Sequence, residues 1–383
     1  MDKTIGLACN ISTGKLDANQ AVSGGKYPFF TCAEYPDQID HFAFDDDVVL
    51  VAGNNARGNF HVSRYKGKFN AYQRTYILTA KEGFDIDYVY YALKLELKRL
   101  REKSQGSQTK FLTMPILTGI HFRDITGNEQ TEIANVLTAI DKKIELNNRI
   151  NAELEAMAKT LYDYWFVQFD FPDANGKPYK TSGGKMDFNP TLKREIPEGW
   201  SDKTLSQIAN ITMGQSPEGI SYNDEGVGTI FYQGSTDFGW LFPTTRQYTT
   251  APSRMAMKGD ILLSVRAPVG DINIANTDCC IGRGLAALNS KTGSDGFLFY
   301  VMKYFKQIFE RRNSEGTTFG SITKNDLHSL TLAYPTLDLL KKYDDVVTNY
   351  NKMIFERSFE NRELASLRDW LLPMLMNGQV TVR

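Results

Sequence analysis

The chain has 383 residues, of which 42% are hydrophobic and 23% charged, as is ordinary for a globular protein of two or three domains. No apolar run reaches the length of a transmembrane helix and no secretory signal opens the chain, so we expect no membrane span and a cytoplasmic protein. The formal net charge of −1 does not by itself indicate a nucleic-acid-binding protein.

The first 128 residues predict a mixed α+β domain. Stretches rich in Val, Ile, Leu and Thr at 48–52 and 75–79 predict strands, and a helix is expected over 86–103. A loop rich in Gly, Ser, Thr and Gln follows, and then a strand-like run. The segment 94–110 carries six basic and two acidic residues, which is unusual enough to mark a candidate binding surface.

Residues 129–168 predict a long helix with one apolar seam. From Ile133 onward, seam residues recur at alternating spacings of four and three over more than four heptads, which is typical of a coiled coil. The predicted seam positions in this helix are Ile133, Leu137, Ile140, Ile144, Asn147, Asn151, Leu154 and Leu161.

Two asparagines lie on this seam, and two explanations stay open for them. A polar seam residue costs stability but fixes the register of the pairing. Alternatively, Asn147 and Asn151 face solvent or another subunit. A change of Asn151→Leu distinguishes the two, because it blurs the register in the first case and weakens only complex assembly in the second.

The second half of the chain repeats the first with a period near 210 residues. A linker at 169–199, rich in Gly, Pro, Lys and polar residues, leads into a second mixed domain at 200–334 and a second long helix at 335–383. Segment pairs that echo each other are "ACNISTGK" (8–15) with "ANITMGQS" (209–216), the runs from Asp46 and from Gly259, 88–94 with 297–303, 106–120 with 316–330, and 144–154 with 354–364. The second domain is expected to hold strands at 260–265 and 272–275 and a basic helix at 296–312.

The second helix carries a weaker seam. Its predicted positions include Val347, Ile354, Asn361, Leu364 and Leu371. Arg357 and Arg368 fall on the same seam, so either the phase differs there or those positions face a partner. The overall expectation is an α+β fold with two pseudo-symmetric domains separated by two long helices.

No catalytic or metal centre is predicted. The four histidines are scattered without metal-ligand spacing, the four cysteines form no CxxC motif, and no Ser/His/Asp set can be nominated. The two "SGGK" stretches lack the remaining residues of a phosphate-binding loop. The residues therefore favour a binding protein over an enzyme.

This arrangement of domain, helix, domain and helix resembles the specificity subunit of type I restriction-modification systems along essentially the full chain. The central stretch "LYDYWFVQFDFPDANGKPYKTSGGKM…LKREIPEGW" (161–200) is the most specific part. "ISTGKLDANQAVSGGKYPFFTC" (11–32) and "GDILLSVRAPVGD" (259–271) are similar to segments of the family's two recognition domains.

The resemblance implies a division of labour in a larger complex. Each recognition domain would read one half of a split, asymmetric site in double-stranded DNA, and an antiparallel coiled coil would set the half-site spacing. The helices would also dock two modification subunits that use S-adenosylmethionine. Restriction subunits using ATP and Mg would join them, and this chain would hold no cofactor and no catalytic centre. Deleting one heptad from each helix should then shift the preferred separation of the half-sites.

Candidate DNA contacts follow from residue chemistry, since Arg suits guanine, Asn and Gln suit adenine, and basic groups bind phosphates. In the first domain they are Asn54, Asn55, Arg57, Gln73, Arg74, Ser104, Gln105, Ser107, Gln108, Thr109 and Lys110. In the second they are Gln233, Ser235, Arg266, Arg283, Thr317, Thr318, Ser321 and Lys324. The expected phosphate contacts are Lys98, Arg99, Arg101, Arg311 and Arg312.

Three other functions remain compatible with the residues. The chain could serve a type IIB-like restriction-methylation system with the same architecture and a different partner. It could be a bivalent coiled-coil adaptor for proteins, although Ser/Thr/Gln-rich loops beside basic helices disfavour that use because protein-binding cores prefer aromatic anchors. It could also be an enzyme with an unrecognised site, which an assay of methyl transfer by the purified chain would reveal.

Overall fold

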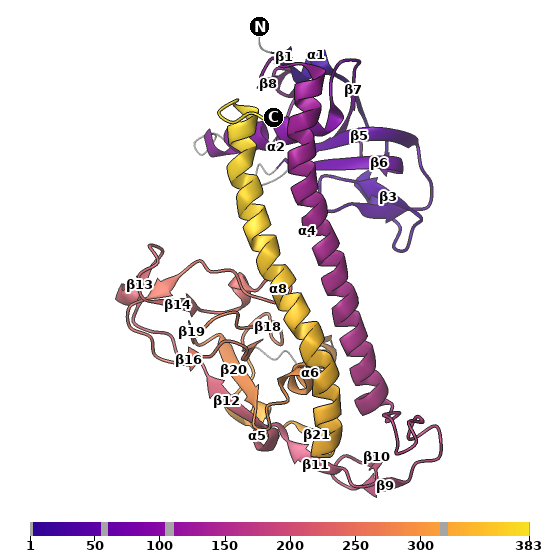
Figure 1. Ribbon diagram of the computed structural model, residues 1–383, viewed down its shortest axis with the longest axis vertical. Helices are drawn as coiled ribbons and strands as arrows, with labels where there is room; N and C mark the ends of the chain where they lie inside the picture. The colour runs from indigo at the N-terminus through magenta and orange to yellow at the C-terminus, as the bar shows by residue number, and fades with distance from the viewer. Residues whose placement is uncertain (1–2, 55–59, 104–110, 315–320, 383) are drawn as a thin grey trace. The chain divides into compact units, whose positions relative to one another are not determined.

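A computed structural model describes residues 3–54, 60–103, 111–314 and 321–382 of the chain (Figure 1). The chain divides into two compact units. Unit 1 comprises Met1–Arg149 and Arg357–Arg383, and unit 2 comprises Ile150–Glu356. Each unit therefore contains one predicted domain together with a portion of both long helices.

Unit 1 contains a six-stranded sheet in the order β2-β7-β5-β6-β3-β4. Neighbouring strands are antiparallel, except that β3 and β6 run parallel. The strands are β2 (Cys9–Thr13), β3 (Tyr27–Phe30), β4 (Asp37–Ile39), β5 (Phe44–Ala52), β6 (Val62–Ala71) and β7 (Thr75–Ala80). A separate two-stranded pair joins β1 (Lys3–Thr4) to β8 (His121–Phe122).

Helix α2 (Ile86–Lys103) covers the sheet of unit 1, and its bounds agree with the predicted helix. Tyr88, Val89 and Leu93 are fully buried in one cluster with Val49 and Leu78 of the sheet. Burying large apolar side chains in this way is the main favourable term in folding. The remaining helices of unit 1's first domain are the short α1 (Ile5–Ala8) and α3 (Met114–Thr118).

Unit 2 repeats this plan with a divided sheet. A four-stranded sheet has the order β12-β20-β17-β18, and a five-stranded sheet has the order β13-β15-β14-β19-β16. The strands are β12 (Ala209–Met213), β13 (Tyr222–Asn223), β14 (Thr229–Tyr232), β15 (Tyr248–Thr249), β16 (Met255–Ala256), β17 (Ile261–Ser264), β18 (Ile272–Ile274), β19 (Cys279–Ile281) and β20 (Leu285–Ser290), with β11 (Ser201–Thr204) paired to β21 (Thr331–Tyr334). The helices are α5 (Leu205–Ile208), α6 (Asp295–Ser314) and α7 (Lys324–Ser329).

Strand register fixes which residues of the two domains are equivalent. Leu78 of β7 pairs with Ile11 and Val49, and Leu288 of β20 pairs with Ile211 and Ile261. The offset is therefore 200 residues at the first strand and 212 at the second. Our alignments of 8–15 with 209–216, and of the run from Asp46 with that from Gly259, were each wrong by one residue. Such a slip moves every side chain to the other face of a strand, which similarity between short apolar runs cannot detect.

One further sequence expectation needs correction, and it concerns the same segment of both domains. The segment after each Ser/Thr/Gln-rich loop begins with a short helix, α3 or α7, before the short strand β8 or β21. At α7 the Thr323 hydroxyl accepts from Asp326 N, and the Asp326 carboxylate accepts from Thr323, so a capping box starts the helix.

The long helices are α4 (Gly127–Tyr162), continued by a π-helical turn at Asp163–Val167, and α8 (Leu337–Met376). Within each unit the two helices run antiparallel. Their predicted seam residues face inward: none is exposed, and Leu137, Val347 and Ile354 are fully buried. Among the residues that the structure describes, no helix is long and apolar enough to span a membrane.

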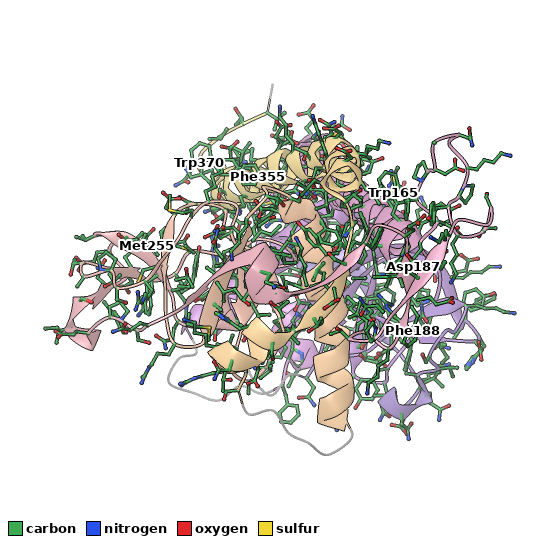
Figure 2. The ribbon with its side chains drawn as sticks, turned by 90° about the horizontal axis from the view of Figure 1, so that it is seen from below. Trp165, Asp187, Phe188, Met255, Phe355 and Trp370 are labelled. Atoms are coloured by element: carbon green, nitrogen blue, oxygen red, sulfur yellow. The ribbon has the colours of Figure 1, made fainter. Side chains whose placement is uncertain are left out.

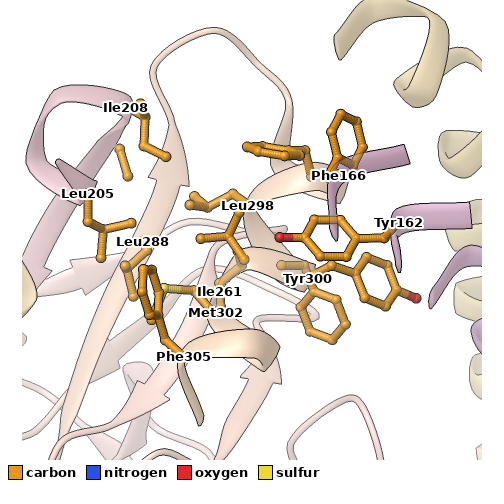
Figure 3. Packing of buried hydrophobic residues seen from close by; sticks show 14 of the residues in the cluster. Tyr162, Phe166, Leu205, Ile208, Ile261, Leu288, Leu298, Tyr300, Met302 and Phe305 are labelled. Atoms are coloured by element: carbon orange, nitrogen blue, oxygen red, sulfur yellow. The ribbon is translucent and has the colours of Figure 1, made fainter. Parts of the chain in front are cut away.

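The predicted linker is an ordered part of unit 2. It contains the hairpin β9 (Met186–Asn189) and β10 (Arg194–Pro197), and Phe169, Ile196 and Trp200 are buried. These residues join an aromatic core in which Tyr162, Phe166, Leu298 and Tyr300 pack together (Figure 3). Phe188 of β9 does not join this core and is 67% exposed (Figure 2).

Candidate nucleic-acid interface

One end of the unit 1 sheet gathers several predicted contacts on a frame of backbone hydrogen bonds. Gly53 N donates to Arg74 O at 2.8 Å, and Leu112 N donates to Gly53 O at 3.0 Å. Gly14 N donates to Thr75 O at 3.2 Å. A Cβ on Gly14 would lie 2.1 Å from a backbone oxygen, so only glycine permits this close approach.

This frame presents Asn54, Gln73 and Arg74 beside Phe111, and we call these four residues the first edge. Gln73 and Arg74 are exposed, and Asn54 is half-buried. Gln73 Nε2 donates to Asp17 Oδ1 at 2.8 Å. The Arg74 guanidinium lies over the Phe111 ring, 5.9 Å from its centroid, which is cation–π geometry.

Unit 2 builds the same frame at the equivalent positions. Val265 N donates to Gly284 O at 2.9 Å, Ile322 N donates to Val265 O at 2.8 Å, and Gly214 N donates to Leu285 O at 2.9 Å. A Cβ on Gly214 would also lie 2.1 Å from a backbone oxygen. The two domains thus hold their loops with matching bonds.

The frame of unit 2 presents Arg266, Arg283 and Ser321, all exposed, and we call these residues the second edge. Arg266 and Ser321 pair as an isolated β-bridge, and Arg283 N donates to Ser216 Oγ at 3.2 Å. Of the other predicted contacts, Gln233 is exposed and shares hydrogen bonds with Ser216, while Lys324 is exposed on the first turn of α7. Ser235 is half-buried in a short 3₁₀ turn.

A basic hollow of about 490 Å³ lies against α2 in unit 1. Its lining includes Lys94, Lys98 and Arg101, whose spacing places them on one face of the helix. The other lining residues are Glu34, Tyr35, Phe60, His61, Val62 and Leu97. Three cations and three aromatic rings at one opening suit a phosphate backbone or an exposed base.

Arg99 does not join this hollow. Its guanidinium pairs with Glu96 and donates to Asn377 Oδ1 at 3.1 Å, because successive helical residues point about 100° apart. It lines a different cavity of about 300 Å³ with His121 and Arg123. The structure therefore brings Lys98 and Arg101 together at the basic hollow and places Arg99 elsewhere.

Several predicted contacts lie outside the described residues. They are Asn55, Arg57, Ser104, Gln105, Ser107, Gln108, Thr109, Lys110, Thr317 and Thr318. Arg311 and Arg312 belong to α6, and their side chains lie outside the described part of the chain.

Sequence reasoning missed Lys94, Tyr35, His61 and Phe111. The spacing of Lys94, Lys98 and Arg101 was an available signal. The other three residues carry none, since only the fold brings Tyr35 and His61 to α2 and Phe111 to Arg74. In the described ranges, no three His, Cys, Asp or Glu side chains are grouped so that they could hold a metal ion.

Comparison with known proteins identifies the family of both domains. The family model for "Type I restriction modification DNA specificity domain" matches residues 2–156 and again 197–355, once for each domain. The chain belongs to the specificity subunits of type I restriction-modification systems.

Curated relatives and a solved structure agree with this assignment. The type I restriction enzyme EcoDI specificity subunit of Escherichia coli is 34% identical over 87% of this chain and 77% of its own length. The MjaX specificity subunit of Methanocaldococcus jannaschii is 33% identical over 67% of this chain, a match that spans 58% of the relative's length. The crystal structure of the M. genitalium S subunit shares the fold, with a TM-score of 0.66 at 18% identity over 98% of this chain and 96% of that one. Two repeated recognition domains are therefore the organising feature of this specificity subunit.

Proposed function

We propose that this specificity subunit reads a bipartite site in double-stranded DNA, with each recognition domain contacting one half-site through its edge. The observation that carries the proposal is the duplication of one backbone frame that presents exposed Gln and Arg side chains and a half-buried Asn. These are the side chains that form paired hydrogen bonds with base edges in the major groove. A pair of such edges in one chain matches a site of two separate halves.

The charge distribution supports a need for partners in DNA binding. Residues 1–128 carry 16 basic and 14 acidic residues, and residues 200–334 carry 12 of each. Non-specific affinity for DNA comes mainly from neutralising phosphates, so a nearly balanced chain gains little of it. The subunit alone should bind DNA weakly at physiological salt, and its complex with modification subunits should bind tightly; nanomolar specific binding by the isolated chain would contradict this.

The basic hollow is the proposed phosphate contact of the first domain. Changing Lys98→Gln together with Arg101→Gln should weaken binding of the complex to all DNA sequences alike, and should make log Kd less steep in log salt by roughly two units of slope. The matched control is Lys66→Gln on β6, whose side chain is 78% exposed outside the hollow. An altered sequence preference in the double variant would contradict a phosphate role.

Two modification subunits are the proposed protein partners, docked on the exposed apolar residues of the long helices. In unit 1, Leu367 and Trp370 of α8 are 43% and 57% exposed. In unit 2, Met157 of α4 and Tyr164 of the π-helical turn that follows it are 52% and 37% exposed, and Met157 is the repeat equivalent of Leu367. One apolar patch in each unit fits two copies of one partner, since exposed apolar clusters commonly mark interfaces.

Assembly tests this docking directly. Trp370→Ala should remove one of two modification subunits, and Met157→Ala with Tyr164→Ala should remove the other, as measured by native mass spectrometry of co-expressed complexes. Tyr35→Ala is the control, because Tyr35 is 77% exposed and lies on the recognition domain of unit 1. Full assembly of all helix variants would reject these patches as docking sites.

In this proposal, catalysis belongs to the partner subunits, which would carry S-adenosylmethionine, ATP and Mg. The support is that the specificity family covers both domains and that the curated relatives are named specificity subunits. Sequencing adenine methylation in a host with and without this chain tests the whole proposal. A bipartite motif should appear only with the chain, and its absence in both hosts would reject the proposed function.

A further inference from the structure

The two domains allow a comparison of equivalent positions inside one chain. The central strands β7 and β20 occupy equivalent places, so Thr75 corresponds to Leu285 and every residue along these strands has a known counterpart. Positions at which the side chain itself makes a structural bond should keep one residue type in both domains. Positions that read different half-sites should differ.

At one end of the central strand the counterparts are identical. Lys81 N donates to Ala8 O and Lys291 N donates to Ile208 O, at 2.8 and 2.9 Å. Lys81 Nζ donates to Gly6 O at 3.1 Å, and Lys291 Nζ donates to Ser206 O at 2.6 Å. Both lysines thus make the same two bonds to a short helix, which explains why both domains use lysine there.

At the other end the backbone bonds again match, but the side chains differ. Asn54 corresponds to Arg266, and Gln73 corresponds to Arg283. Phe111 corresponds in the same way to Ser321. Gln73, Arg266 and Arg283 are exposed, so packing does not explain the difference.

We propose that these two equivalent pairs determine which base each half-site requires at equivalent positions. Asn54 and Gln73 would select adenine in the half-site of the first domain, and Arg266 and Arg283 would select guanine in that of the second. The inference rests on the proposed function, because it assigns bases to edges that are there proposed to contact DNA.

The chemistry of each pair supports the assignment. An Asn or Gln amide accepts from adenine N6 and donates to N7, whereas the Arg guanidinium donates to both O6 and N7 of guanine. The bond from Gln73 Nε2 to Asp17 leaves the second N–H and the Oε1 atom of Gln73 for a base, and it fixes the amide orientation. On the second edge, the Ser216 hydroxyl holds the Arg283 backbone while the guanidinium stays exposed.

Reciprocal exchange of one equivalent pair tests the proposal in the complex with modification subunits. Methylation motifs are sequenced for Arg283→Gln and for Gln73→Arg. Arg283→Gln should relax or change one guanine of the second half-site, with discrimination falling roughly 5- to 150-fold, and leave the first half-site intact. Gln73→Arg should alter one adenine of the first half-site only. Lys291→Gln and Lys81→Gln are matched controls that should leave both half-sites unchanged.

The methylation motifs distinguish failure of the base assignment from failure of the proposed function. If both exchange variants keep the parental motif, or if methylation falls equally at every sequence, the assignment of bases to these residues is overturned while DNA recognition by the chain stands. If the unaltered complex yields no bipartite motif, the proposed function itself fails. Co-purification of each variant with the modification subunits verifies that the exchanged chains fold.

Discussion

The two stretches where α4 and α8 pair are held together by different chemistry. In unit 2 the contact is aromatic: Tyr343 is fully buried, and its ring centroid lies 5.0 Å from that of Phe166 and 6.0 Å from that of Trp165. In unit 1 polar bonds join the helices beside the apolar packing of Leu137 and Leu375. Asn147 Nδ2 donates to Glu360 at 2.7 Å and to Asn361 at 2.9 Å, and Arg368 binds Asp141.

The difference indicates that the aromatic stretch mainly stabilises the helix pair, whereas the polar bonds fix its register. Apolar burial is strong but non-directional, so the aromatic stretch tolerates small slides along the helix. Paired polar groups contribute less free energy, but a slide by one position leaves them without partners. Asn147 is only 1% exposed and bonded to α8, which favours register over docking as its role and accounts for a polar residue on the seam.

In each unit a tyrosine of the recognition domain also donates a hydrogen bond to α4. In unit 1, Tyr91 Oη of α2 donates to Asp141 Oδ2 at 2.8 Å, and Arg368 Nη1 donates to the other carboxylate oxygen at 2.8 Å. Burial opposes the charge of Arg368, but its bonds to Asp141 and Asp369 outweigh this and raise its pKa. In unit 2, Tyr300 of α6 donates to the backbone of Glu155 and Lys303 pairs with that residue's carboxylate.

Removing the aromatic contact should have the largest effect on stability. Tyr343→Ala leaves a cavity among Tyr162, Trp165 and Phe166, and should lower the free energy of unfolding by about 3–5 kcal/mol. Tyr343→Phe removes only the hydroxyl that donates to Ala158 O at 3.2 Å and should cost about 0.5–1.5 kcal/mol. Urea unfolding measures both, and equal losses would mean that packing does not dominate this stretch.

Breaking the charged contact of unit 1 should cost less. Arg368 and Asp141 have side chains 23% and 27% exposed, and Arg368→Ala should destabilise by about 1.5–3 kcal/mol by removing a charged hydrogen-bond partner. Adding Asp141→Asn should recover part of the loss, because no carboxylate is then left without its cation. A double-mutant cycle by urea unfolding checks this, and strictly additive losses would show that the two groups are not coupled.

If Asn147 fixes the register of the two helices, its replacement should change stability even less but should alter how α4 and α8 align. Asn147→Leu should alter the free energy of unfolding by no more than about 1 kcal/mol, since apolar burial offsets the lost hydrogen bonds. The distance distribution between spin labels placed at Lys142 and Ser366 should nevertheless broaden. Asn151→Leu, on the seam in unit 2 and also 1% exposed, provides the comparison there. Unchanged distributions in both variants would remove the asparagines as register determinants.

The sequence predicted the long helices, the duplication and the inward-facing seam, because heptad spacing over many turns is a strong signal. It did not separate Arg99 from Lys98 and Arg101, since charge runs do not show which way a side chain points. It also placed Arg368 on the seam without finding Asp141, because that pairing joins residues 227 positions apart. The first and second edges needed strand register, which local similarity leaves uncertain by one residue.

The contrast between polar and apolar chemistry extends to the starts of the long helices. At the start of α4, the Glu129 carboxylate accepts from Thr126 N and from its hydroxyl, both at 3.0 Å, whereas the equivalent position at the start of α8 is the buried Leu339. The backbone bond from Thr126, followed by the hydroxyl bond, lowers the pKa of Glu129.

This lowered pKa predicts that the start of α4 makes stability depend on pH, whereas Leu339 at the start of α8 makes no such contribution. A carboxyl group whose folded pKa lies below its unfolded value of about 4.3 stabilises the fold above that pH, and the contribution disappears as pH falls through the folded pKa. Glu129→Gln keeps a capping oxygen but cannot ionise. The urea midpoints of the two proteins should therefore differ slightly at pH 7 and converge below pH 4. A difference that persists unchanged into acid would mean that ionisation of Glu129 does not stabilise the start of α4.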